Sequence, residues 1–561
     1  MLLTRLFRKK SLDVILKQGG DGEHSGLNKV LTVKDLTFFG IAAIIGGGTF
    51  SAIGNACFSN GTGPGVILLY IICAIACGFT AMCYAEFASR VPVSGSAYTY
   101  AYVSFGELFA WIIGWALLME YSIGNIYIAF SWSGYFTNLL ESFGLHLPEW
   151  LTINYKSAHV AFLENKTGEG YLAWQNAPEI AGLKIIFDMP AVLINVLITY
   201  LIYRGTSESK NVSNFMVYLK LVVIVLVIAV GAFYIDIDNW TPFMPNGFKG
   251  VMAGVSAVFF AYIGFDAVST LAEESKNPQH DLPRGMIYSL VVCTIVYIIL
   301  ALVLTGMVKY DLLGVSDPLA EIFALKGIKW MLFIGLSIAA VAAMTSVMLV
   351  FQMGQPRIWM TMSRDGLMPK QFASIHPKHK TPGFATIVTG IVVGLPIFFT
   401  DENFVLDFTS IGTLFAFVLV CGGVLMLAPH NEKEANNPTK GKFRIPYINS
   451  KWIFPIIVVL SLGTINFLLP DYFSTTFSLN ETNLTTNLPF IVFFIFTLVM
   501  AVLSFLKNLS LIPLLGLISC CYLLTGMAVS NWKWFGVWLL IGLVIYFSYG
   551  FKNSKLNKNS L

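Results

Sequence analysis

Apolar runs long enough to cross a lipid bilayer recur along this chain, from about Leu36 to Tyr549. A helix that crosses the roughly 30 Å hydrocarbon layer needs about 20 predominantly apolar residues, whereas a spanning strand needs only about 10. Hydrophobic residues make up 56% of the 561 residues and charged residues 12%, while a soluble globular protein carries about 25% charged residues. We therefore predict an all-α polytopic membrane protein, and not a barrel.

The runs predict fourteen spans with both termini in the cytoplasm. Most of the 35 lysines and arginines fall in the segments that this arrangement places inside, as the positive-inside rule requires. The apolar runs that we assign as spans cover about residues 36–57, 64–90, 106–143, 188–203, 212–235, 249–272, 286–308, 328–355, 384–400, 404–428, 452–470, 488–506, 510–528 and 533–550.

Two of these spans contain a break. The run IIGGGTF (residues 44–50) places three glycines inside an apolar segment, and each glycine weakens a helix by about 1 kcal/mol relative to alanine. The run AVFFAYIGFDAVST (residues 257–270) places Gly264 and Asp266 in another. Unwound backbone is tolerated in a membrane only where protein buries it or where it lines a wet cavity. Close packing of small residues between helices is the alternative explanation.

The chemistry of such breaks predicts a binding site for a zwitterion. The free N–H groups at a half-helix N-terminus attract an anion, and free carbonyl oxygens attract a cation. The second break comes five spans after the first, which indicates two repeats of opposite orientation. The predicted units are a cytoplasmic segment 1–35, a first repeat 36–235, a second repeat 236–428, accessory helices 429–550 and a cytoplasmic tail 551–561.

Several longer motifs resemble a known family. IAAIIGGGTF resembles the first-helix motif of the amino acid–polyamine–organocation superfamily. Four further motifs are similar to the cationic amino acid transporter family: GWALLMEYSIG (114–124), FFAYIGFDAVSTLAEESKNPQHDLPRG (259–285), GQPRIWMTMSRDGLMP (354–369) and SIGTLFAFVLV (410–420). The resemblance implies a five-plus-five inverted-repeat fold, about four accessory C-terminal helices and sodium-independent amino acid transport by alternating access.

The resemblance also implies where a substrate would lie. Its carboxylate would meet the backbone around Ile45, Gly46, Gly47, Gly48 and Thr49, and its ammonium would meet carbonyls near Phe260, Ala261 and Ile263. Relatives often carry a threonine between these glycines, so a hydroxyl contact is absent at Gly47. Met344, on the eighth span, would shorten the space for a long side chain if it faces the pocket, although a core methionine is the plainer interpretation.

Ionisable residues inside spans are functional candidates, because each costs about 2.5–3.5 kcal/mol at the bilayer centre on insertion scales. Lys220 is our candidate for proton coupling, since burial disfavours the charged ammonium; family likeness places Thr345 and Ser346 beside it. Glu120 is expected at the wall of the site, near a cationic side chain or a water. Asp266 is a possible gate or coupling partner. Each has an alternative explanation. Lys220 would then only hold helices together, Glu120 would be a structural carboxylate, and Asp266 would cap the unwound segment.

These features and the resemblance predict a secondary active permease that moves cationic or small neutral L-amino acids across the cytoplasmic membrane, coupled to protons and independent of sodium. An obligate exchanger is the alternative within the same class. A membrane-embedded enzyme is less favoured, because the sequence has no HExxH, no GxSxG with triad partners and no Walker motif. The expected partners are an amino acid, protons and the bilayer; we expect no nucleic acid, no metal and no cofactor.

Overall fold

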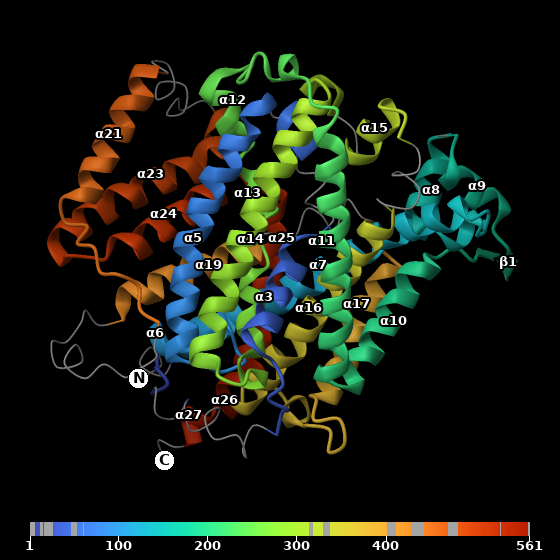
Figure 1. The fold of residues 1–561 in the computed structure, drawn as a ribbon. Helices are drawn as coiled ribbons and strands as arrows, with labels where there is room; N and C mark the ends of the chain where they lie inside the picture. The colour runs from blue at the N-terminus through green and yellow to red at the C-terminus, as the bar shows by residue number, and fades with distance from the viewer. Residues whose placement is uncertain are drawn as a thin grey trace.

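The protein is almost entirely helical (Figure 1). The computed structural model describes residues 6–11, 15, 26–46, 53–59, 61–165, 167–180, 182–313, 318–328, 337–400, 411–427, 443–468, 481–527 and 529–558. Within these ranges the only sheet is a hairpin of two-residue strands, β1 (Glu179–Ile180) and β2 (Leu183–Lys184). The hairpin belongs to the segment between α7 and α10, which also holds α8 (Tyr155–Leu163) and α9 (Glu169–Asn176).

Twelve helical segments of the described chain are candidates for membrane spans. Seven are long and apolar: Gly63–Arg90 with α5 (Val66–Arg90), α7 (Glu107–Ser142), α11 (Thr206–Ala232), α14 (Pro278–Met307), α16 (Ser337–Arg364), Asn487–Lys507 within α23 (Glu481–Lys507), and Val529–Asn553 with α25 (Val529–Ile545) and α26 (Phe551–Asn553). Five are shorter: α10 (Met189–Arg204), α17 (Gly383–Ile397), α19 (Ile411–Met426), α21 (Ile453–Leu468) and α24 (Leu511–Thr525).

Shorter helical pieces make up the two interrupted regions. The first begins with α3 (Val33–Ile44), whose N-terminus is fixed by a capping box between Thr32 and Asp35. The second comprises α12 (Gly247–Ala253), α13 (Val255–Phe260) and the 3-10 helix η5 (Phe265–Glu274). Outside these regions lie α6 (Ala97–Ser104), α15 (Pro318–Leu325) and α27 (Lys555–Lys558).

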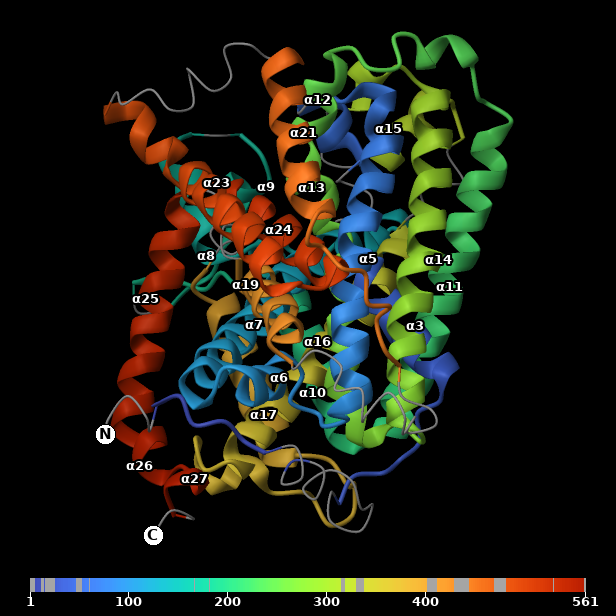
Figure 2. The same ribbon diagram turned by 90° about the vertical axis from the view of Figure 1, so that its left-hand side faces the viewer.

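The interrupted helices occupy the interior of the bundle. α3 packs against α14, α11, α16 and η5, and α14 in turn packs along α5. α7 crosses the bundle and packs along α16. Figure 2 shows α21, α23, α24 and α25 on the side of the bundle away from α11 and α14. The C-terminal helices therefore cover one side of the bundle that the earlier helices form.

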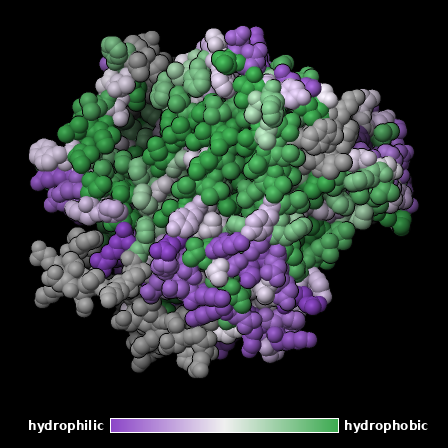
Figure 3. Space-filling view, viewed as in Figure 1, coloured by the Kyte–Doolittle hydropathy of each residue, from purple (hydrophilic) through white to green (hydrophobic). Residues whose placement is uncertain are grey.

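The outer surface is that of a membrane protein. Figure 3 shows a broad hydrophobic band and, below it, a hydrophilic end. Large apolar side chains such as Val222 and Leu540 are more than 60% exposed. Such exposure needs a lipid environment, since soluble proteins rarely expose large contiguous apolar patches. The protein is a multi-pass integral membrane protein.

Both ends of the described chain meet at the lower end of the molecule in Figure 1. The guanidinium of Arg8 donates to the carbonyl of Leu556 at 2.9 Å, and the amide of Glu107 donates to the carbonyl of Arg8 at 3.0 Å. The carboxylate of Glu107 accepts hydrogen bonds from Tyr102, Tyr546 and Ser554. These contacts fasten the terminal segments to the start of α7.

Several predicted span ends need correction. The eighth helix, α16, ends at Arg364 and not near residue 355, because its polar last turns are buried by partners from other helices. α11 and α14 begin at Thr206 and Pro278, ahead of the predicted starts at 212 and 286, since their first turns are polar and extend beyond the apolar run. The two helices after Asn508 are separate, as expected.

The contact between α7 and α25 depends on a glycine. The indole N–H groups of Trp115 and Trp538 each donate to the other's carbonyl oxygen, and their rings stack with centroids 4.7 Å apart. A Cβ atom on Gly542 would lie 2.3 Å from the Trp115 ring. Only a residue without a side chain lets the two helices approach this closely.

We predict that Gly542→Val lowers the thermal unfolding temperature of the detergent-purified protein, because overpacking costs about 1–3 kcal/mol. Gly536→Val, in the same helix, is the matched control, since a Cβ there meets nothing within 4 Å. Equal unfolding temperatures for the two variants would contradict this view of the α7–α25 contact.

Candidate functional site

Two helix ends face each other inside the bundle. α3 ends at Ile44, and Ile45 already has extended backbone, with φ −82° and ψ 90°. α13 ends at Phe260, a turn follows, and η5 starts at Phe265. The predicted contacts at Gly47, Gly48 and Thr49 lie outside the described residues. The described chain thus places both interruptions where the glycine-containing runs predict them.

A cavity lies between these ends and the helices α7 and α16, and its empty space, including the part that is open to solvent, is about 630 Å³. Six of the predicted site residues line it: Gly46, Glu120, Phe260, Ala261, Ile263 and Met344. The rest of the lining comes from Ala43, Ile44, Gly124, Tyr127, Ile128, Ser131, Val347 and Phe351, which the sequence reasoning did not single out. Their spacing on α7 and α16 is the ordinary spacing of a buried helix face, so no signal separated them from core residues.

The turn after α13 requires glycine. Gly264 has φ +124°, a conformation that residues with a side chain rarely adopt. A Cβ on this residue would lie 2.9 Å from the backbone and side chain of Ala43. Gly264 therefore allows the second interruption to pack directly on the end of α3, which fixes the floor of the cavity.

Tyr297 joins the two interruptions, and the sequence reasoning missed it. Its hydroxyl, on α14, lies 3.0 Å from the carbonyl oxygen of Ile44 and 2.9 Å from that of Ala261. One phenolic proton is thereby shared between the carbonyl groups of α3 and of the turn after α13. The side chain is fully buried, and it packs against the rings of Tyr70 and Tyr262. A tyrosine in an apolar run looks like a core residue, so only the structure shows this bridge.

Lys220 is completely buried and fixes the other side of the first interruption. Its ammonium donates to the carbonyl of Ile45 at 2.8 Å and lies 3.2 Å from the carbonyls of Ile41 and Ala42. The last carbonyl groups of a helix carry partial negative charge, so the end of α3 is a favourable place for a cation. Lys220 therefore occupies a cation site made of backbone oxygens.

The two hydroxyls predicted beside Lys220 differ in their contacts. Ser346 accepts a hydrogen bond from the ammonium at 2.9 Å. The hydroxyl of Thr345 instead accepts from the indole N–H of Trp132 at 2.8 Å and donates to the carbonyl of Val341. Thr345 thus holds α7 against α16, one residue away from the lysine site.

Glu120 lines the cavity, and its hydrogen-bond partner is a residue of α19 that does not line the cavity. Its carboxylate accepts hydrogen bonds from the amide and from the hydroxyl of Thr413, in the first turn of α19. The side chain is 7% exposed. A carboxylate at a helix N-terminus is favoured by the helix dipole. Glu120 therefore links α7 to α19 through hydrogen bonds, as the structural alternative expects, and it also lines the cavity.

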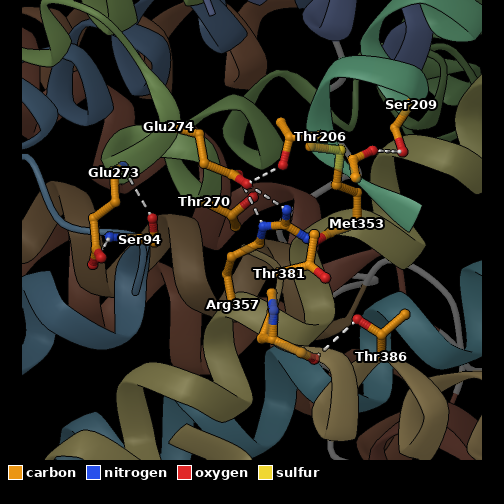
Figure 4. Close-up of polar contacts among 12 residues, drawn as sticks. Ser94, Thr206, Ser209, Thr270, Glu273, Glu274, Met353, Arg357, Thr381 and Thr386 are labelled. Carbon is orange, nitrogen blue, oxygen red and sulfur yellow. Dashed lines mark hydrogen bonds and ion pairs between the residues drawn. The ribbon is translucent and has the colours of Figure 1, made fainter. Parts of the chain in front are cut away.

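Asp266 lies at the start of η5, not on the cavity surface. It is 2% exposed, and no basic side chain of the described chain lies within ion-pair distance of it. Nearer the lower end, η5 is tied to α16 (Figure 4). The buried guanidinium of Arg357 donates to both carboxylate oxygens of Glu274 at 2.6 and 3.0 Å, and Thr206 donates to the same carboxylate.

A second set of ion pairs lies beside the first. Arg364 donates to both oxygens of Glu273, and the ammonium of Lys10 lies 2.5 Å from Asp365. Glu273 and Glu274 are both buried, within η5, and paired with arginines of α16. Their partners lie about ninety positions away in the chain, which no local pattern reveals.

A metal ion needs histidine, cysteine, aspartate or glutamate side chains that are grouped around it. Within the described ranges, no three histidine, cysteine, aspartate or glutamate side chains are grouped as a metal site would require. The eight cysteines are free thiols, and seven of them are buried.

We predict that Tyr297→Phe lowers the unfolding temperature in detergent, because a buried carbonyl that loses its partner costs about 1–3 kcal/mol. Tyr288→Phe is the control, since Tyr288 is on the same helix and 49% exposed. If the two variants unfold alike, the hydroxyl bridge does not stabilise the interruptions.

Comparisons with known proteins agree with this architecture. A family model described as "Amino acid permease" matches residues 31–486, and one described as "C-terminus of AA_permease" matches residues 509–554. The chain is 38% identical over 556 residues to the branched-chain amino acid permease BcaP of Bacillus subtilis, with 99% of each chain covered. It is 35% identical over 558 residues to the methylthioribose transporter of the same organism, covering 99% of this chain and all of the relative. It is also 30% identical to the human cationic amino acid transporter 4, over 96% of this chain and 89% of the relative. Members of the matched family are transporters and not enzymes, and this chain belongs to the amino acid permease family.

Proposed function

We propose that the protein is a secondary active permease that moves neutral L-amino acids together with protons, without sodium, by alternating access across the cytoplasmic membrane. The observation that carries this proposal is the cavity that residues at the ends of α3 and α13 line together. The proposed fold is five plus five inverted helices with four accessory helices. Both termini would be cytoplasmic, so that the lower end of Figure 1 faces the cytoplasm.

The two interruptions supply complementary partners for an α-amino acid. The substrate carboxylate would approach the backbone from Gly46 onward, where the glycines leave room for close contact. The ammonium would approach the carbonyl oxygens at the end of α13, around Phe260 and Ala261. The N–H groups freed in the glycine run and the carbonyl oxygens at the end of α13 would together favour a zwitterion over a molecule that carries only one of the two groups.

The cavity walls favour an apolar side chain. Ile128, Val347 and Phe351 line the cavity together with Met344, and Glu120 is the one carboxylate among the lining residues. The hydrogen bonds from Thr413 already engage that carboxylate. Of the cationic and small neutral substrates that the sequence predicts, this lining favours the neutral ones. The name of the Bacillus subtilis branched-chain permease supports the same choice.

Lys220 is the proposed proton-coupling residue. Its ammonium holds carbonyl oxygens at the end of α3, next to the proposed carboxylate site. A neutral amine would donate fewer hydrogen bonds and would no longer balance the helix end electrostatically. Loss of its proton would therefore loosen the segment that binds the substrate, which links proton binding to substrate binding.

The ion pairs between η5 and α16 are the proposed inner gate. Arg357 with Glu274, and Arg364 with Glu273, join the two elements at the end that we place in the cytoplasm. These bonds would break when the cavity opens inward. Asp266, at the start of η5, would move with η5 and cap the turn that precedes this helix.

We predict that leucine or valine raises the unfolding temperature of the purified protein, whereas the matching amide or the decarboxylated amine does not. A ligand at 100 times its Kd stabilises the folded state by about 2.7 kcal/mol. Arginine and lysine should give smaller shifts than leucine. Stabilisation by methylthioribose with no effect of any amino acid would overturn the substrate proposal in favour of a sugar thioether, as the name of the second relative suggests.

We also predict that Lys220→Met abolishes the dependence of uptake on an imposed proton gradient in proteoliposomes. Lys210→Met, on the same helix but with a side chain that is 21% exposed and paired with Asp35, should retain that dependence. Counterflow of labelled substrate separates coupling from binding. Unchanged proton dependence in Lys220→Met would remove this residue from the coupling step, and uptake that requires internal amino acid would favour an exchanger.

A further inference from the structure

A second cavity shares no lining residue with the proposed substrate cavity. It lies beside α24, one of the accessory helices that pack on one side of the bundle (Figure 2). The empty space between its walls, including the part that is open to solvent, is about 590 Å³. α24 packs against both α5 and α19, and the cavity opens where these three helices meet the turn between α23 and α24. Its lining residues are Glu86, Arg90, Val424, Leu425, Leu427, Ile445, Tyr447, Lys507, Asn508, Leu509, Ser510 and Pro513.

An extended segment builds one wall of this cavity. The amide of Phe443 donates to the hydroxyl of Ser89 at 2.7 Å, and the amide of Ile445 donates to the carboxylate of Glu86 at 3.2 Å. Farther along, the hydroxyl of Tyr447 donates to the carbonyl of Asn508 at 2.6 Å. The segment therefore spans from the end of α5 to the turn after α23, and it holds the cavity walls at fixed positions.

The charge of the cavity is positive. Arg90 lies 2.5 Å from Glu86, and these two side chains balance each other. Lys507 remains, and no carboxylate of the described chain lies within ion-pair distance of it. The three ionisable side chains of the lining thus leave one net positive charge, which fits a ligand with one net negative charge.

The rim of the cavity continues into the surface that faces lipid. Met426 is 56% exposed, and Leu506 is 67% exposed, directly before Lys507. Apolar residues of α19 and α24, such as Leu425 and Pro513, form the inner wall. A ligand here would have an anionic group beside the basic side chains and apolar chains along the rim, and both features belong to a phospholipid.

We propose that this cavity binds the headgroup of an anionic phospholipid of the inner leaflet, with its phosphate near Lys507 and Arg90. Basic pockets between helices on the cytoplasmic side are suited to anionic headgroups. The bound lipid would brace α5 against α19 and the α23–α24 turn. The site lies apart from the substrate cavity and does not depend on which molecule the permease carries.

The test uses the full-length protein in detergent, titrated with dioleoylphosphatidylglycerol or dioleoylphosphatidylcholine and followed by native mass spectrometry and thermal unfolding. We expect one phosphatidylglycerol to bind in preference to phosphatidylcholine and to raise the unfolding temperature. Lys507→Gln should weaken this binding about fivefold, the contribution of one basic side chain near an anionic lipid surface. Lys507→Glu should weaken it further.

Lys552→Gln is the matched control, because Lys552 is an exposed lysine near the lower end but outside the cavity lining. It should bind phosphatidylglycerol as the unmodified protein does. Equal losses in Lys507→Gln and Lys552→Gln would overturn the proposal in favour of unspecific charge attraction. Stabilisation by inorganic phosphate to the same extent would overturn it in favour of a free-anion site, and equal binding of the two lipids would overturn it outright.

Discussion

The central constraint in this structure is that backbone groups released inside a membrane need partners. An unpaired polar group in a low-dielectric interior costs several kcal/mol, and a membrane span cannot be interrupted unless that cost is met. Here the ammonium of Lys220 donates a hydrogen bond to the carbonyl of Ile45 at the end of α3. The hydroxyl of Tyr297 lies within hydrogen-bond distance of the carbonyl oxygens of Ile44 and Ala261. Both partners come from helices that are themselves continuous, α11 and α14. The cavity exists because these two continuous helices support two discontinuous ones.

Much of the fold follows from apolar run lengths alone. The bounds of α7, predicted as 106–143 and observed as Glu107–Ser142, are set by where the apolar run starts and stops. The same rule fails for α16, because Gln352, Gln355 and Arg357 look like the start of a loop when read in sequence. They are buried since Ser122, Asn195 and Glu274 supply their hydrogen bonds from other helices. Polar residues that are paired across the fold are indistinguishable, in a single sequence, from polar residues that face water.

The candidate site was predictable in its outline and not in its detail. The glycine run and Gly264 marked the interruptions, and an ionisable residue in an apolar run marked Lys220. Thr345 contacts Trp132 of α7, whereas Ser346 contacts Lys220 of α11. Neighbouring residues of α16 point in different directions, and the sequence does not show which of them faces α11. Tyr297 carried no signal at all, because its function lies in the hydroxyl and its packing is that of any core tyrosine.

The link between the cavity and the lower end runs through η5. Runs of 3-10 helix longer than three or four residues are uncommon, because their hydrogen bonds are less favourable than those of an α-helix, and η5 extends over ten residues. A change from the 3-10 rise of about 2.0 Å per residue to the α-helical rise of about 1.5 Å would shorten such a segment by about 5 Å. One end of η5 adjoins the turn at Gly264 that shapes the cavity, and the other carries Glu273 and Glu274. Ion pairs with N···O distances of 2.6 and 2.7 Å would not survive a displacement of that size, so under the proposed function a change in the helix geometry of η5 would link an occupant of the cavity to these contacts at the lower end.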